Sequence, residues 1–198
     1  MRASPKISAA TLALLVAVSC TRSSDRVQNR LVGCHHFPNL EPAVCELTSD
    51  GNIVVAKQSL ADMAFGSEGL GSIVIDNRGL YFVTRHGKTT PALNFDNGPD
   101  YVVEGLARTV KNGKVGFINT ELDPVVPPIW DFAFPFEHGV AVVCTRCVST
   151  PAFAGDEHPT MTGGKWGYID KRGKVVIPVV YDSRSLPPVE VAEKQAAQ

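Results

Sequence analysis

Short apolar runs rich in valine, isoleucine and aromatic residues alternate with turn residues along much of the chain. The stretch GGKWGYIDKRGKVVIPVVYD (163–182) shows the pattern, because one apolar run precedes a turn that closes on Gly173 and a second run comes after it. Runs of this length, bounded by Gly, Pro and Asp, predict short β-strands joined by tight turns. The pattern therefore predicts an all-β fold.

The same pattern recurs earlier in the chain. NGKVGFINTELDPVVPPIWD (112–131) places Phe117 fifty-one positions before Tyr168, and GLYFVTRHGKTTPALNFD (79–96) is a weaker copy. A further element, an aromatic residue leading to Gly and Val, precedes these copies at 65–74, 101–110 and 136–144. A half copy spans 45–60. These copies predict about three and a half units.

Each unit is expected to contain three antiparallel strands. Asn112-Gly113 predicts a tight hairpin turn between the first and second strands. Gly87 and Gly173 predict the turn between the second and third strands in their units. Pro127 and Pro178 lack an amide donor, so they are expected at the end of a strand or on an edge strand. Because an isolated hairpin is marginal in water, the units are expected to stack into one domain.

The repeated pattern resembles the bacterial WG-repeat family, named for a Trp-Gly pair. Trp166-Gly167, YIDKRGKVVIP and the final YD carry the resemblance, which covers about residues 65–182 and starts at the earliest at Val44. It implies tandem β-hairpin units, and we place the repeat domain at residues 41–186. Gly116 and Gly167 are expected to lie under a closely packed aromatic ring or backbone. Trp166 is either core filler or an exposed binding platform. Asp96, Asp131 and Asp182 are interpreted as turn or backbone-capping carboxylates.

The N-terminus is interpreted as a targeting segment. Residues 1–19 have a basic start and an apolar core and predict a lipoprotein signal peptide, with Cys20 of AVSC as the lipidated residue. Residues 20–40 then form the anchor and a polar tether. Thr21 rather than Asp after the cysteine favours the outer membrane, facing the periplasm; the alternative is a soluble secreted protein. Residues 187–198 are polar and predict a flexible tail.

Lipidation of Cys20 would leave an even set of four cysteines. We expect the disulfides Cys34–Cys45 and Cys144–Cys147, as suits an oxidising compartment. Other pairings remain open, since four cysteines allow three. A metal site that combines the cysteines with His35, His36 and His158 is the alternative, although the spacing fits no compact zinc motif.

The last unit carries an insertion between its first and second strands. The loop is expected over residues 145–164 and includes Asp156, Glu157 and His158. Loops on rigid scaffolds often bind ligands, but they also tolerate neutral insertions. Both interpretations stay open at this stage.

The net charge and the absence of known motifs limit the classes of function that the sequence supports. The net charge of −1 argues against a nucleic-acid binder, and no catalytic or cofactor motif is found. We expect a non-catalytic scaffold without a cofactor, tethered to the cell envelope, that binds another protein or envelope component. The alternatives are a metal-binding or metal-sensing periplasmic protein that uses the Cys/His set and an enzyme with its site at the insertion.

Overall fold

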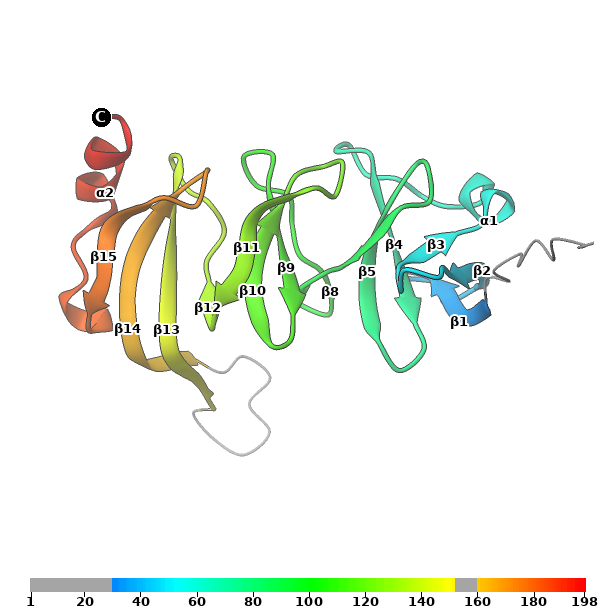
Figure 1. The fold of residues 1–198 in the computed structure, drawn as a ribbon, viewed down its shortest axis with the longest axis horizontal. Coiled ribbons are helices and arrows are strands. Elements are labelled where there is room, and N and C mark those ends of the chain that lie inside the picture. The colour runs from blue at the N-terminus through cyan, green and yellow to red at the C-terminus, as the bar shows by residue number, and fades with distance from the viewer. Residues whose placement is uncertain (1–29, 152–159) are drawn as a thin grey trace, which may run out of the picture.

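Antiparallel β-sheets succeed one another along the long axis of the molecule (Figure 1). The computed structural model describes residues 30–151 and 160–198. Its strands are β1 (Arg30–His36), β2 (Pro42–Leu47), β3 (Ile53–Val55), β4 (Leu70–Ile75), β5 (Gly79–Thr84), β6 (Thr89–Pro91), β7 (Asn94–Phe95), β8 (Gly98–Pro99), β9 (Ala107–Lys111), β10 (Lys114–Ile118), β11 (Pro124–Trp130), β12 (Phe132–Ala133), β13 (Val140–Thr150), β14 (Thr160–Asp170) and β15 (Val175–Tyr181). Its helices are α1 (Lys57–Ala61), α2 (Val189–Ala196) and the 3-10 turn η1 (Ser183–Ser185).

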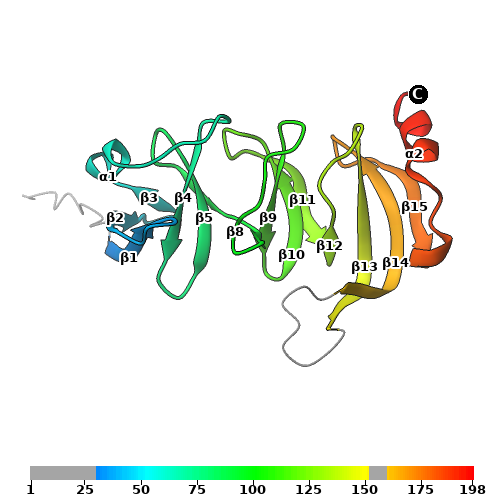
Figure 2. The ribbon, with the colours of Figure 1, turned by 180° about the vertical axis from the view of Figure 1, so that it is seen from behind.

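Three-stranded antiparallel units are the building block of the fold. Within the described residues these are unit 1 (β1–β2–β3), unit 2 (β4–β5–β6), unit 3 (β9–β10–β11) and unit 4 (β13–β14–β15). Units 1 and 2 join into one sheet because β1 pairs with β4. Figure 2 shows the same row of units from behind. The prediction of an all-β fold of tandem antiparallel units is confirmed, and the half copy at 45–60 proves to be β2 and β3 of a complete unit.

The same turn joins the second and third strands of every unit. The first residue donates its N–H to the carbonyl of the fifth at 2.9–3.1 Å, and the fourth donates to the carbonyl of the first. The four turns are Thr48–Asn52, Thr84–Lys88, Asn119–Asp123 and Asp170–Lys174. Gly87 and Gly173 have positive φ at the fourth position, as predicted, and Leu122 adopts the same conformation in unit 3.

The glycine of the Trp-Gly pair lies under the backbone of the third strand. A Cβ on Gly116 would be 2.5 Å from the carbonyl oxygen of Val126, and one on Gly167 would be 2.5 Å from that of Ile177. The strand register shifts at this point in both units. The predicted close approach is confirmed, and backbone rather than an aromatic ring makes it. The third strands β11 and β15 are edge strands, so Pro127 and Pro178 lie where predicted.

Side chains of adjacent units share one core. The rings of Phe117 in unit 3 and Phe136, just before unit 4, have centroids 4.6 Å apart. Trp130, at the end of β11, packs in the same buried cluster as Val143 and Ile169 of unit 4. Burial of these apolar side chains between units stabilises the stack, as predicted from the recurrence of aromatic residues.

Both predicted domain boundaries need correction. Residues 30–36, placed within the tether 20–40, form β1. This strand pairs with β2 on one side and with β4 on the other. Residues 189–196, within the predicted flexible tail 187–198, form α2, which packs Val189 and Ala192 against Tyr168 and Ile177. The predicted domain 41–186 is therefore too short at both ends.

The predicted signal peptide (1–19) and Cys20 lie outside the described residues, as does the first part of the tether. Within the described residues, no helix has the length and apolar character needed to cross a membrane.

Candidate functional site: the β-ribbon of unit 4

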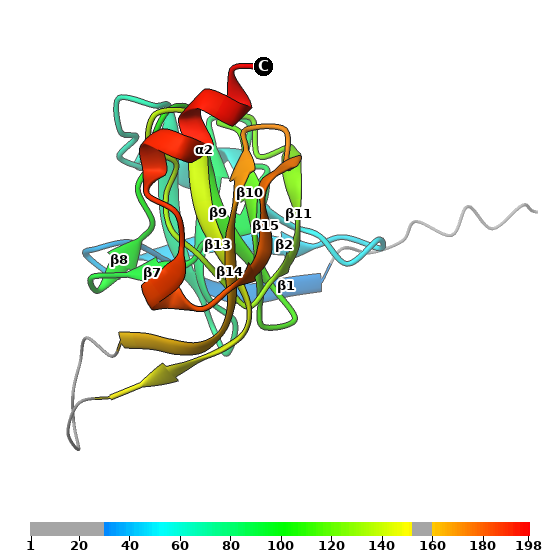
Figure 3. The same ribbon diagram turned by 90° about the vertical axis from the view of Figure 1, so that its left-hand side faces the viewer.

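The predicted insertion is largely a continuation of β13 and β14. The two strands pair as far as Thr150 and Thr160, so residues 145–150 and 160–164 of the predicted loop belong to a ribbon. Figure 3 shows this end of β13 and β14 leading away from the body of the molecule. We call the paired residues 145–150 and 160–165 the ribbon. The predicted binding residues Asp156, Glu157 and His158 lie outside the described residues.

A break in the strand ladder marks the base of the ribbon. The pairing passes from Thr145–Lys165 to Cys147–Gly163, which leaves Arg146 and Gly164 out of the regular ladder. Arg146 has a positive φ of 58°, and a Cβ on Gly164 would lie 2.4 Å from the backbone of β13. The register is the same on both sides of this break, so it is a local distortion of both strands and not a β-bulge with an extra residue.

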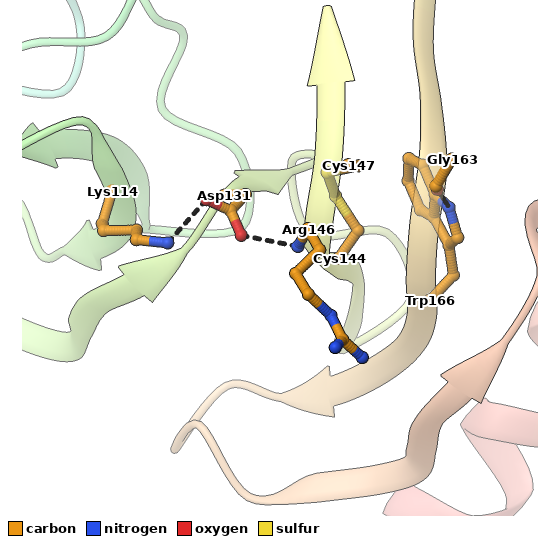
Figure 4. Close-up of a disulfide and its surroundings, with 7 residues drawn as sticks. All are labelled: Lys114, Asp131, Cys144, Arg146, Cys147, Gly163 and Trp166. Carbon is orange, nitrogen blue, oxygen red and sulfur yellow. Dashed lines mark hydrogen bonds and ion pairs between the residues drawn. A yellow bond between two sulfur atoms is a disulfide. The ribbon is translucent and has the colours of Figure 1, made fainter.

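A disulfide and a buried indole stabilise this base (Figure 4). Cys144 and Cys147 are bonded across this break in the ladder, as predicted, and pack against Trp166. The Trp166 side chain is 4 % exposed, and its Nε1–H donates to the carbonyl of Gly163 at 2.7 Å. Trp166 is therefore core filler, and its interpretation as a binding platform is wrong, because the disulfide and the edge of the ribbon cover the ring.

Lysine–aspartate pairs recur beside the Trp-Gly position. Lys114 Nζ lies 2.5 Å from Asp131 Oδ1, and Lys165 Nζ lies 2.9 Å from Asp182 Oδ1. Asp131 also accepts the N–H of Arg146 at 2.7 Å, which connects unit 3 to the base of the ribbon. The Lys114 hydrogen bond and this amide hold the pKa of Asp131 below its usual value. The predicted backbone-capping role is confirmed for Asp131, whereas Asp182 pairs with a side chain.

These elements coincide with a known sequence family. The sequence model of the WG containing repeat matches residues 116–146 and 166–183, which lie in units 3 and 4 and the segment between them. The chain carries WG repeats. Searches of curated proteins and of solved structures gave no significant match.

The second cysteine pair lies at the other end of the row of units, in unit 1. Cys34 and Cys45 are bonded between β1 and β2, as predicted. His36 is buried and His35 is partly exposed, with Nε2 3.3 Å from an Asp76 oxygen, so the adjacent histidines point in different directions. In the described part of the chain, no three Cys, His, Asp or Glu side chains are grouped to hold a metal ion.

A buried ion pair in unit 3 was not predicted. Arg108 is 2 % exposed, and its Nε and Nη2 bind the two carboxylate oxygens of Asp100 at 2.9 and 2.6 Å. Arg108 Nη1 also donates to the carbonyl of Ala133 at 2.9 Å. A signal was available, because the repeat places Arg108 opposite Phe117, where the apolar Val142 lies opposite Tyr168 in unit 4.

Proposed function

We propose that this WG-repeat protein is a non-catalytic binding scaffold of the bacterial cell envelope. A lipid on Cys20 tethers it to the outer membrane, and the ribbon engages another protein or envelope component. The basic start, apolar core and AVSC sequence of residues 1–20 support the tether. The family match supports a repeat scaffold.

The extension of β13 and β14 beyond their unit carries the proposal. Units 2 and 3 connect their first two strands through the short turns 76–78 and 112–113, whereas unit 4 continues pairing from Cys147–Gly163 to Thr150–Thr160. A free two-stranded ribbon is marginal in water. The disulfide, Trp166 and the Asp131–Arg146 hydrogen bond hold its base, so the ribbon enters solution with a defined direction.

The ribbon offers unpaired backbone to a partner. Among the described residues, neither 145–150 on its outer edge nor 160–165 on the opposite edge pairs with a third strand. Val148 is 61 % exposed on this surface. Open strand edges bind extended segments by main-chain hydrogen bonds, with side chains such as Val148 providing specificity.

Site-specific cross-linking in the native envelope tests the proposal. A photoreactive amino acid replaces Val148 in the full chain, and Val180, also 61 % exposed but located on β15, provides the matched control. We expect a discrete cross-linked product at position 148 only. Replacement of residues 148–162 by Asn-Gly should leave the fold intact and abolish partner binding, because Cys147 and Gly163 are already paired. Equal products at both positions would contradict a role for the ribbon.

The tether is tested separately by the intact mass of the mature protein. We expect a diacylglyceryl-type addition on Cys20 and its loss in Cys20→Ala, with release of the protein from the membrane fraction. Unmodified Cys20 in a membrane-free protein would contradict the tether and leave the ribbon experiment valid.

A further inference from the structure

Two aromatic residues depart from the buried pattern at the junction between units 2 and 3. Phe95 lies thirty-five positions before Trp130. Tyr101 is next to Val102, which is the counterpart of Phe136, because Val103 bridges Leu106 as Glu137 bridges Val140. Trp130 and Phe136 are buried in the shared core, whereas Phe95 and Tyr101 are 47 % and 60 % exposed. Because these two rings are exposed, they do not give the stabilisation that large aromatic side chains normally provide when they are buried.

The buried ion pair accounts for this departure. Arg108 occupies the position of Val142 in unit 4, because Arg108 pairs with Phe117 as Val142 pairs with Tyr168. Asp100 binds this arginine in the interior of unit 3. The guanidinium carbon of Arg108 lies 5.2 Å from the centre of the Phe95 ring, so that ring covers the ion pair rather than entering the core. A buried ion pair is often no more stable than apolar residues of similar volume. Packing alone therefore does not account for this arrangement.

The outward aromatic residues line a groove of about 520 Å³. The Phe95 and Tyr101 rings have centroids 6.0 Å apart and planes at 75°, so they form adjoining walls. Phe37, from the β1–β2 connection, and Phe82 of β5 add aromatic surface. Aromatic walls with a few polar groups are typical of ligand sites.

The charges in the groove favour a cationic ligand. The exposed carboxylates Glu68 and Asp96 line it, while the charge of Asp100 is balanced by Arg108. The described residues place no lysine, arginine or histidine in the lining. Aromatic faces attract cations through the ring quadrupole, and carboxylates add direct attraction.

We propose that this groove binds an organic cation, namely a protonated or quaternary ammonium group. The inference rests on the proposed role of the chain as a binding scaffold and assigns it a second surface, at the junction of units 2 and 3 rather than on the ribbon of unit 4. The ammonium group belongs either to a free amine or to a lysine side chain.

Amide chemical shifts of the labelled full-length mature chain test the proposal. Choline and N-acetyl-lysine-N-methylamide are the probes and distinguish the two sources, and 3,3-dimethylbutan-1-ol is the neutral isostere of choline. We expect saturable shifts within residues 95–102 for at least one cation, with a roughly millimolar Kd that rises with salt. Glucose serves as a second neutral probe. Binding of either neutral probe as strong as that of the cations would overturn the cationic assignment. The absence of saturable shifts with both cations would overturn it as well.

Variants link binding to the named side chains. Tyr101→Ala should raise Kd about two- to fivefold, the effect of one exposed cation–π contact, and Glu68→Gln with Asp96→Asn should weaken binding and remove its salt dependence. Phe134→Ala, 47 % exposed outside the groove, and Glu121→Gln are matched controls that should bind normally. If neither cation binds in the groove while Val148 still gives its cross-linked product, this inference is overturned and the proposed function of the ribbon stands.

Discussion

Gly167 lies directly against the carbonyl oxygen of Ile177, so that a Cβ on residue 167 would be 2.5 Å from that oxygen. Gly116 has the same relationship to Val126 one unit earlier. The glycine of the repeat motif is thus a point of contact between two strands. Its partner at each point is backbone, which cannot move aside as the end of a flexible side chain can.

Alanine at either position should therefore destabilise the fold. We expect Gly167→Ala and Gly116→Ala each to lower the free energy of unfolding by about 1–3 kcal/mol, the usual cost of forcing an extra carbon into a packed site. Urea unfolding measures the effect. Gly66→Ala is the control, because its Cβ would be 3.7 Å from the nearest atom. A similar loss in all three variants would show that close approach is not the cause.

Arg108 and Asp100 should behave as a coupled pair. Arg108→Met leaves the Asp100 carboxylate buried without its partner and should cost about 3–5 kcal/mol of unfolding free energy. The double variant Arg108→Met/Asp100→Leu should recover most of this loss, since no buried charge remains. Chemical denaturation of the four members of this double-mutant cycle measures the coupling. Additive losses would contradict an ion pair that acts as a unit.

The sequence predicted the parts of the fold that have a strong local period. Alternating apolar residues and Gly turns identified β9–β10–β11 and β13–β14–β15. The strand β1 was missed because His35 and His36 interrupt its apolar pattern, and its pairing with β4 is a tertiary contact. Helix α2 is short, and its apolar face has little more than Val189 and Ala192 to signal burial.

The candidate site was predictable only in part. The spacing of Cys144 and Cys147 and the insertion identified the base of the ribbon, but not that β13 and β14 pair through it. For Trp166 both interpretations stayed open, because burial depends on the groups that cover the ring. Arg108 is a charged residue in a core position, and only its partner Asp100, brought near by the folded β7–β8 connection, makes that position acceptable.

The two disulfides should differ in their contribution. Cys34–Cys45 closes the longer loop, with a sequence separation of 11 against 3 for Cys144–Cys147. Loop-closure entropy predicts losses of about 3 and about 2 kcal/mol for the paired Cys→Ala variants. Denaturation under non-reducing conditions measures both. Equal losses, or a larger loss for Cys144→Ala/Cys147→Ala, would contradict the ranking.

Loss of the Cys144–Cys147 bond should also have a local effect. Beyond Cys147, the described ribbon strands pair with each other and with no third strand. We therefore expect faster amide hydrogen exchange at Val148–Thr150 in Cys144→Ala/Cys147→Ala. Exchange in β9 and β10 should change only with global stability, and Cys34→Ala/Cys45→Ala is the matched control. Unchanged protection of the ribbon would show that the disulfide does not hold it.

The docking of α2 should depend on pH through His138 and Glu193. His138 Nδ1 lies 2.7 Å from a Glu193 carboxylate oxygen, and this hydrogen bond is the main cause that raises the pKa of His138 above its ordinary value of 6.5. A group whose pKa is higher in the folded state stabilises that state fully below its unfolded pKa. The contribution is then lost as the pH rises through the raised value. Attachment of α2 is therefore expected to weaken from slightly acidic to mildly alkaline pH.

An NMR titration of the His138 ring in the native chain and in Glu193→Gln checks this expectation. The pKa of His138 should fall toward its ordinary value in the variant. The difference in Tm between the two proteins should be largest near pH 6, about where histidine is charged, and shrink above pH 8. His35→Gln, at the other end of the array beside Asp76, is the control and should leave the His138 titration unchanged. A Tm difference that stays constant with pH would mean that Glu193 stabilises α2 by packing and not through the charge of His138.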